Sequence, residues 1–471
     1  MTGDPIISGS RGILVLGLAI SSLLGVGARA DGSQAAGPPD PAAAPAPALN
    51  APGADSAGFP DPSQWSVHAQ ATVIEQWHYG FPAEYSGRNS LESRTTEDKH
   101  TVTATLFIGR RLWPGGEIYF DPEVPEGEGL SGTVGMAGFP NGEGTRASGD
   151  SPHYSTSRLF LQQTFELGGG KEQVEDDANQ LAGEKEANRL TLTAGKFAAV
   201  DYFDDNACSH DPRTQFMNWA LMDSGAWDYP ADTRGYTAGF VAELRQKGWA
   251  TRYGIMMEPQ EANQLVLDKH VTKAFAQVLE LDRSYSWDGH PATVRPFLFL
   301  NRADMGSYSE AIADPAARLD VTRTREYRSK YGAGLSWDQE LTANTGAFLR
   351  LSWNDGKTES WAFTEIDRSI AGGISLKGAA WGRAGDVAGL AGIANGLSSE
   401  HRQYLAAGGY GFIIGDGRLN YGPEEVVEAY YDAKVARRLW ITPDLQYAEH
   451  PGYNRDRGGL PIFAIRAHWE Y

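Results

Sequence analysis

Residues 204–236 contain the densest group of polar and aromatic side chains in the sequence. The group consists of Asp204, Asp205, Asp211, Arg213, Gln215, Trp219, Trp227, Asp228, Tyr229, Asp232 and Arg234. Aromatic rings offer apolar platforms, while carboxylate, amide and guanidinium groups accept or donate hydrogen bonds. A ligand with flat C–H faces and many hydroxyl groups, such as a sugar, needs this combination more than it needs one strongly charged group. The segment is therefore predicted to narrow a path for a polar solute.

The same side chains can serve a purely structural purpose. Most polar side chains bond to neighbouring groups or water, so ion pairs here could simply tie a loop to a protein wall. Pro212 and Pro230 restrict the backbone and favour an ordered segment under either interpretation. The choice between a lining role and a clamping role stays open for each residue.

A second group of candidate lining residues lies nearer the N-terminus. It consists of Arg111, Glu117, Asn141, Glu143, Arg146, Arg158 and Gln162. Of the adjacent Arg110 and Arg111, either can anchor the chain at a phosphate-rich interface, or one can face an internal passage. Arg158 and Gln162 are predicted to share one strand face with Thr164, because apolar residues alternate with them and take the other face.

No catalytic residue, metal site or cofactor is predicted. The chain contains neither Gly-x-Ser-x-Gly nor His-Glu-x-x-His, and its 10 histidines form no pair with ligand spacing. The turn at Gly415-Asp416-Gly417 fits a tight hairpin better than a calcium loop. A formal net charge of -19, from 41 basic and 60 acidic residues, argues against a nucleic-acid partner. The single Cys208 excludes an intrachain disulfide.

The chain divides into three parts. Residues 1–30 combine a polar leader, an apolar run at 12–27 and the small-residue site Ala28-Arg29-Ala30, which predicts a secretory signal peptide cleaved before Asp31. The apolar run is too short for a spanning helix of about 20 residues. Residues 31–64 are rich in Pro, Ala and Gly and predict a flexible periplasmic tail. Residues 65–471 have no further linker and predict one large domain.

Residues that alternate between apolar and polar recur throughout this domain. At the C-terminus, Phe463, Ile465, Ala467, Trp469 and Tyr471 alternate with Arg466, His468 and Glu470, and the chain stops on the aromatic residue. Similar alternation marks residues 101–109, 158–167, 190–194, 427–435 and 439–447. No segment after the signal peptide has 18 consecutive apolar residues, so helical spans are not expected. The pattern predicts an all-β fold, a transmembrane antiparallel barrel of about 16 strands with inward-folded loops and Tyr471 beside the first strand.

Several longer motifs resemble the OprB-type family of carbohydrate-selective porins of Gram-negative outer membranes. They lie at residues 126–131, 138–143, 195–197, 201–206, 210–219, 225–236, 353–356, 401–405, 415–417 and 454–458. The resemblance extends from about residue 70 to the C-terminus. Cys208 in place of an aromatic residue, Tyr471 in place of Phe and the Pro/Ala-rich tail depart from the family pattern. The resemblance implies a sugar-permeable outer-membrane channel, trimeric or monomeric, and not an enzyme.

Two rival functions remain beside passive sugar diffusion. A plugged barrel of the same fold could bind or export surface polysaccharide, which differs from a porin only in whether the lumen is open. An outer-membrane hydrolase would need a catalytic site that the motifs do not supply. The expected partners are carbohydrate solutes, outer-membrane lipid and lipopolysaccharide. The identity of the sugar, the degree of selectivity and the oligomeric state are left open.

Overall fold

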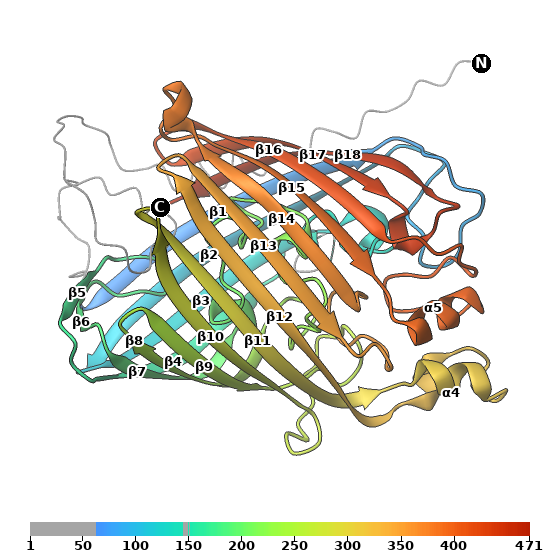
Figure 1. The fold of residues 1–471 in the computed structure, drawn as a ribbon, viewed down its shortest axis with the longest axis horizontal. Coiled ribbons are helices and arrows are strands. Elements are labelled where there is room, and N and C mark those ends of the chain that lie inside the picture. Colours follow the sequence, from blue (N-terminus) through green and yellow to red (C-terminus); the bar gives the residue numbers. More distant parts are fainter. Residues whose placement is uncertain (1–62, 145–148, 150) are drawn as a thin grey trace. The chain divides into compact units, whose positions relative to one another are not determined.

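The computed structural model of the chain describes residues 63–144, 149 and 151–471. In this part, 16 strands close into an antiparallel barrel (Figure 1), so the predicted all-β barrel is confirmed. The strands are β1 (Trp65–His78), β2 (Glu97–Trp113), β3 (Gly116–Gly127), β4 (Ser155–Glu166), β7 (Arg189–Phe197), β8 (Thr237–Gln246), β9 (Trp249–Met256), β10 (Phe275–Trp287), β11 (His290–Met305), β12 (Glu326–Thr342), β13 (Thr345–Asn354), β14 (Arg368–Lys377), β15 (Val387–Gly396), β16 (Glu424–Ala436), β17 (Leu439–Glu449) and β18 (Gly458–Glu470).

The barrel closes where the C-terminal strand meets the first one. Gln70 of β1 lies opposite Glu470 of β18. The backbone N–H of Ala69 donates to the carbonyl oxygen of Tyr471 at 3.1 Å, and the N–H of Tyr471 donates to Ala69 at 2.8 Å. Tyr471 therefore occupies the last pairing position, as the sequence predicted.

The period-two pattern separates an apolar outer face from a polar inner face. On β4, Leu159, Leu161 and Phe165 are exposed on the outside, while Arg158 and Gln162 take the opposite face. Successive side chains of a strand point to opposite faces, so the exposed apolar rings and branches form the outer belt. No helix in the described part of the chain is long and apolar enough to cross a membrane.

The two ends of the barrel differ in the length of their connections. One end, called here the short-turn end, contains both barrel termini and tight turns such as residues 114–115, 247–248 and 288–289. Its longest connection, residues 167–188, contains the two-stranded sheet of β5 (Lys171–Val174) and β6 (Gly183–Glu186). The opposite end, called the long-loop end, contains the helices α4 (Tyr308–Ala313) and α5 (Ser399–Ala406) and the 3-10 helices η1 (Leu130–Gly132), η3 (Val321–Thr324) and η5 (Pro451–Tyr453). The 3-10 helix η4 (Gly378–Trp381) lies in a connection at the short-turn end.

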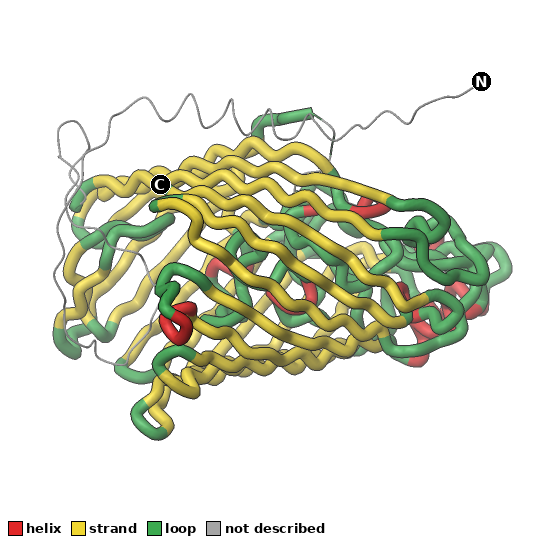
Figure 2. Tube along the Cα trace, turned by 90° about the horizontal axis from the view of Figure 1, so that it is seen from above, coloured by secondary structure: helices red, strands yellow, loops and turns green. Residues whose placement is uncertain are grey.

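Two connections at the long-loop end fold into the interior of the barrel. Figure 2 shows loop segments inside the ring of strands. Residues 128–144 belong to the connection between β3 and β4. Residues 198–236, called here the inner segment, join β7 to β8 and contain η2 (Ala199–Asp201) and α3 (Trp219–Met222). Both bond to inward-facing side chains of the strands. The predicted signal peptide, all but residues 63 and 64 of the predicted tail, and Arg146 lie outside the described residues.

Glycines on β12 make room for aromatic rings inside the barrel. Phe297 of β11 lies opposite Gly334 of β12, and Phe299 lies opposite Gly332. A Cβ atom at Gly334 would lie 2.2 Å from the ring of Phe297. The absence of a side chain therefore allows the ring to cover the backbone of the neighbouring strand.

The glycine at position 334 predicts a difference between the two faces of one strand. Gly334→Leu should displace the ring of Phe297 and destabilise the barrel by roughly 1–3 kcal/mol through overpacking. Ala333→Leu, the matched control, adds the same bulk to the outer face, where the barrel expects apolar residues, and should be tolerated. Samples of each variant are heated to a series of temperatures before electrophoresis. The temperature at which the folded band disappears measures the stability of the barrel. Equal stability of the two would contradict this account of the inner face.

Candidate functional site

The inner segment crosses the inside of the barrel and is held by charged side chains of the wall. Arg350 of β13 lies between Leu349 and Leu351, which face outward, so its own side chain faces inward. Its Nε lies 3.1 Å from Oδ1 of Asp204, and its Nη1 donates to the carbonyl oxygen of Leu221 at 2.8 Å. The guanidinium is almost fully buried. One wall arginine thus binds two distant points of the inner segment.

The neighbouring part of the segment is held by β16 and β18. Arg466 donates through Nη1 to the carbonyl oxygens of Pro212 and Gln215, both at 2.7 Å. Glu428 accepts the backbone N–H groups of Met217 and Asn218 at 2.5 and 2.9 Å. The wall carboxylate therefore accepts from backbone donors of the segment, and the wall guanidinium donates to its carbonyl oxygens, so these buried backbone groups have partners.

Asp228 connects the inner segment to a third connection of the long-loop end. Its carboxylate lies 3.0 Å from Nζ of Lys330 on β12. It also accepts the backbone N–H groups of Trp361 and Ala362 at 2.8 and 2.9 Å. Asp228 and Lys330 are both buried. The expected lining residue Asp228 is therefore a clamp in the structure.

Arg213 joins the inner segment to residues 128–144 and to β3. Its guanidinium lies 3.1 Å from Glu123 of β3 and 3.1 Å from Glu143. Glu143 also accepts the hydroxyl of Thr103 at 2.7 Å, and Asn141 donates to Thr101 at 3.1 Å. Arg213, Asn141 and Glu143 are buried. The structure brings these three predicted residues together, but it uses them to hold two segments against the wall.

The aromatic residues of the segment form a packed core inside the barrel. Trp219 stacks between Phe139 and Phe363, with ring centroids 5.4 and 4.7 Å apart, and Tyr229 packs edge-on against Trp219 and Trp227. Trp219, Trp227 and Tyr229 are each at most 3% exposed. The expectation of aromatic platforms for a sugar is therefore corrected for these three rings, because their faces are covered by other rings.

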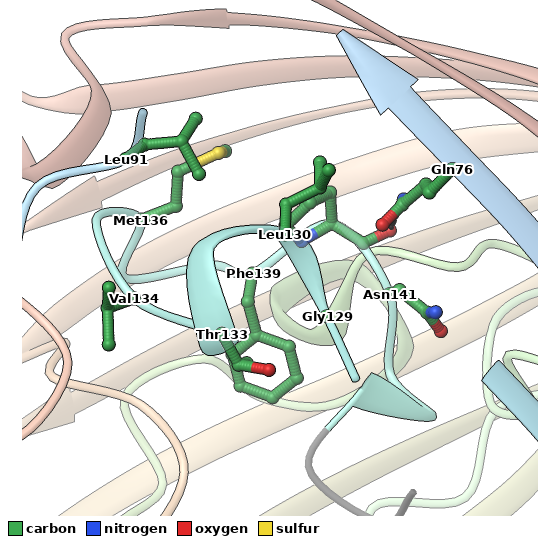
Figure 3. Close-up of a pocket in the computed structure, with 10 residues that line it drawn as sticks. Gln76, Leu91, Gly129, Leu130, Thr133, Val134, Met136, Phe139 and Asn141 are labelled. Atoms are coloured by element: carbon green, nitrogen blue, oxygen red, sulfur yellow. Dashed lines mark hydrogen bonds between the residues drawn. The ribbon is translucent and has the colours of Figure 1, made fainter. Parts of the chain in front are cut away.

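Packing between residues 128–144 and the wall leaves little space. A cavity lined by Gln76, Leu130, Phe139 and Asn141 (Figure 3) has a volume of about 10 Å³. Such a volume accommodates about one water molecule and excludes a sugar. Gln76 of β1 donates across this junction to the carbonyl oxygen of Pro140 at 2.9 Å. Residues 128–144 therefore fit closely against the inner surface of the barrel wall.

Other predicted residues keep part of their side chains accessible inside the barrel. Arg158 lies 2.6 Å from Asp201 and 3.5 Å from Asp121. Asp205 is the most open, with 60% of its side chain exposed, and lies 3.7 Å from Arg295. Gln162, Asp211, Gln215 and Arg234 are half-buried. These accessible groups include both signs of charge and neutral amides, all of which can form hydrogen bonds with a polar solute.

Arg111 and Glu117 lie near the short-turn end. Their side chains are 3.2 Å apart on the inner face, and Glu117 is buried and accepts the hydroxyl of Tyr119 at 2.8 Å. The guanidinium of Arg110 instead lies over the ring of Trp65 at 4.7 Å, on the other face of the strand from Arg111. Of the two adjacent arginines, Arg111 thus faces inward and Arg110 faces outward.

Burial changes the ionisation of two groups in the inner segment. Burial, reinforced by the neighbouring Asp204, raises the pKa of Asp223 well above its ordinary value. Burial raises the pKa of the Cys208 thiol to about 12, so the thiol is not a reactive nucleophile at neutral pH. In the described part of the chain, no group of three His, Cys, Asp or Glu side chains is arranged to hold a metal ion.

Several residues of this site were not singled out in the sequence. Arg295, Lys330 and Arg350 lie on strands whose apolar neighbours face outward, so strand alternation contains the signal that would place them inside. Only the folded chain shows which of these inward cations meet the inner segment.

Removal of Arg213 should loosen the inner segment. Arg213→Ala leaves the buried carboxylates of Glu123 and Glu143 without this cation, which costs about 3–5 kcal/mol for a buried ion pair. Arg323→Ala is a matched control, because Arg323 forms an exposed pair with Asp320 at 3.3 Å and such pairs contribute less than about 1 kcal/mol. The two variants are compared by the temperature at which each loses its folded band on gels. A loss no greater in Arg213→Ala would contradict the clamp.

The raised pKa of Asp223 predicts a pH dependence of stability. A carboxyl group whose pKa is raised in the folded state stabilises the fold at pH values below its unfolded pKa of about 4, and this stability is lost as the pH rises through the folded pKa. Asp223→Asn keeps the neutral form at every pH. Wild type should therefore lose more stability than this variant between mildly acidic and alkaline pH, with Asp288→Asn on an exposed turn as control. Parallel pH profiles for all three proteins would exclude this role of Asp223.

Comparisons with known proteins agree with this architecture. A model of the family described as carbohydrate-selective porins, OprB family, matches residues 99–471. The high-pH structure of Pseudomonas putida OprB is similar at 14% identity and a TM-score of 0.65, covering 87% of this chain and 94% of that one. The outer membrane channel DcaP of Acinetobacter baumannii aligns at 9% identity and a TM-score of 0.48, over 88% and 99% of the two chains. No curated protein sequence matches the chain. On the family match, the chain belongs to the OprB family of carbohydrate-selective porins.

Proposed function

We propose that the protein is a porin through which mono- or small oligosaccharides diffuse passively across a Gram-negative outer membrane, after export directed by residues 1–30. The observation that carries this proposal is the polar interior of a closed barrel, narrowed by two inward segments and lined by accessible groups of both signs. Family membership supports the same solute class. The short-turn end, with its compact connections, faces the periplasm under this proposal.

The charge arrangement favours neutral solutes. Arg158 lies beside Asp201, and Asp205 lies beside Arg295, so each of these two accessible charges has an opposite charge next to it. A sugar hydroxyl can donate to a carboxylate or accept from a guanidinium without carrying charge into the narrow zone. We assign Arg111, Arg158, Gln162, Asp205, Asp211, Gln215 and Arg234 to the solute path, and the buried residues described above to its support.

Planar-bilayer recordings and liposome swelling test the proposed function with the purified full chain. We expect an ion current that added sugar reduces, and swelling that is faster with a hexose than with a disaccharide. A barrel plugged by its loops, as in a protein that binds or exports surface polysaccharide, would carry no current and admit neither sugar. A conducting protein that is indifferent to every hexose and disaccharide would contradict sugar diffusion.

Adjacent glutamines on β4 give a matched pair for the solute path. Gln162 faces inward and lies 3.3 Å from the hydroxyl of Thr193, whereas Gln163 faces outward and accepts the indole N–H of Trp113. Loss of one neutral hydrogen bond costs about 1 kcal/mol, or about a fivefold change in sugar affinity. Gln162→Ala should therefore weaken current block by sugar, while Gln163→Ala should leave it unchanged. Equal block in both variants would remove Gln162 from the path.

A further inference from the structure

The connection between β4 and β7 is unusual for the short-turn end. Residues 167–188 form a hairpin of β5 and β6, whereas several neighbouring turns contain two residues. Figure 1 shows β5 and β6 at the end of the barrel opposite α4 and α5. The tip of the hairpin, residues 175–182, does not project away from the barrel. It bonds to side chains that face the inside of the wall.

Contacts with two strands fix the position of the tip. The carbonyl oxygen of Asp177 accepts the hydroxyl of Ser66 at 3.0 Å, and the carboxylate of Asp176 lies 3.2 Å from Nε2 of His68. Asn179 donates to the carboxylate of Asp121 at 2.9 Å. Ser66 and His68 belong to the inner face of β1, on which Gln70 and Thr72 also lie. The tip therefore lies against the inner surface of β1 and β3.

A buried leucine at the tip and polar contacts at the base of the hairpin also hold it in this position. Leu181 is fully buried in the core cluster that contains Tyr119 and Phe160. Nζ of Lys185 lies 3.6 Å from Glu117, and Arg111 donates to the carbonyl oxygen of Ala182 at 3.3 Å. A buried leucine and several polar contacts hold the hairpin more firmly than a solvated turn would be held.

The hairpin also brings charge to this end of the barrel. Residues 167–188 contain six acidic and two basic side chains, at Glu172, Glu175, Asp176, Asp177, Glu184, Glu186, Lys171 and Lys185. Glu175 and Glu184 are exposed, and Glu184 lies 2.7 Å from Nζ of Lys171; the six carboxylates still outnumber the two lysines. Fixed charges near a narrow passage change the local concentration of mobile ions of each sign.

We propose that the 167–188 hairpin is a second narrowing element of the channel, inserted from the short-turn end, and that its carboxylates favour cations over anions at that opening. The inner segment narrows the passage from the long-loop end, so a solute passes two separate elements in series. This inference rests on the proposed channel function. It assigns a selectivity role to a connection that enters the barrel from the end opposite the inner segment.

Replacement of residues 167–188 by a two-residue Asn-Gly turn tests the narrowing in the full chain. Asn-Gly suits a tight hairpin between antiparallel strands. We expect single-channel conductance to rise about twofold or more, because a constriction in series is removed. Leu181→Ala provides a second variant that keeps the backbone and should raise conductance and its fluctuations by releasing the tip. A folded replacement variant, or Leu181→Ala where the replacement does not fold, with wild-type conductance and fluctuations would overturn the proposal.

The charge role is tested separately by the double variant Glu175→Gln, Glu184→Gln. Its reversal potential in a KCl gradient should show a fall of about twofold in the preference for K⁺ over Cl⁻. Asp288→Asn is the matched control, since Asp288 lies on the exposed β10–β11 turn at the same end and adopts a left-handed conformation that Asn tolerates. An unchanged preference in the double variant overturns the charge role.

Failure of the inference and failure of the channel function give different results. A wild-type protein that conducts ions and admits sugar, with variants that match it, overturns the hairpin proposal alone. A wild-type protein that carries no current overturns the channel function and the hairpin proposal together. Heat-modifiability on gels establishes in each case that the barrel is folded.

Discussion

The interior of this barrel depends on compensation between charged wall residues and the polar backbone of the inner segment. Arg350 and Arg466 donate to carbonyl oxygens of the segment, and Glu428 accepts its N–H groups. A loop carries many backbone polar groups, and burying them without partners would be costly. The wall can therefore hold residues 198–236 in its interior only because its inward-facing side chains replace the water that an external loop would bind.

This constraint explains why charged residues of the segment are poor indicators of a solute path. Arg213 and Asp228 have the side-chain chemistry of a binding site, but each forms buried ion pairs with the wall or with another loop. Asp205 has the same chemistry as Asp228 and remains mostly exposed. The difference is one of position, because Asp228 lies inside the packed aromatic region and Asp205 lies at its margin. Buried, ion-paired side chains and accessible side chains thus alternate within about 30 residues of one connection.

Sequence alternation was sufficient to predict the barrel, and it was insufficient to predict the interior. Leu159, Leu161 and Ile465 defined strand faces because a strand has a strict period of two. The burial of Trp219 and Trp227 follows from Phe363 of another connection and Phe297 of β11, and no local pattern in residues 204–236 contains that information. The hairpin of β5 and β6 was missed for a related reason. Its glycine-rich, acidic sequence is typical of an exposed turn, and the single leucine that it buries, Leu181, is not distinctive.

The two elements that enter the barrel from opposite ends are connected through one part of the wall. Asp121 of β3 accepts a hydrogen bond from Asn179 of the hairpin and lies 3.5 Å from Arg158. Arg158 in turn pairs with Asp201, in the first turn of the inner segment. A shift of the hairpin tip therefore changes the environment of a guanidinium that also holds the inner segment. Because Arg158 keeps part of its side chain accessible, the width and the charge of the passage at this level depend jointly on both elements and cannot be assigned to either alone.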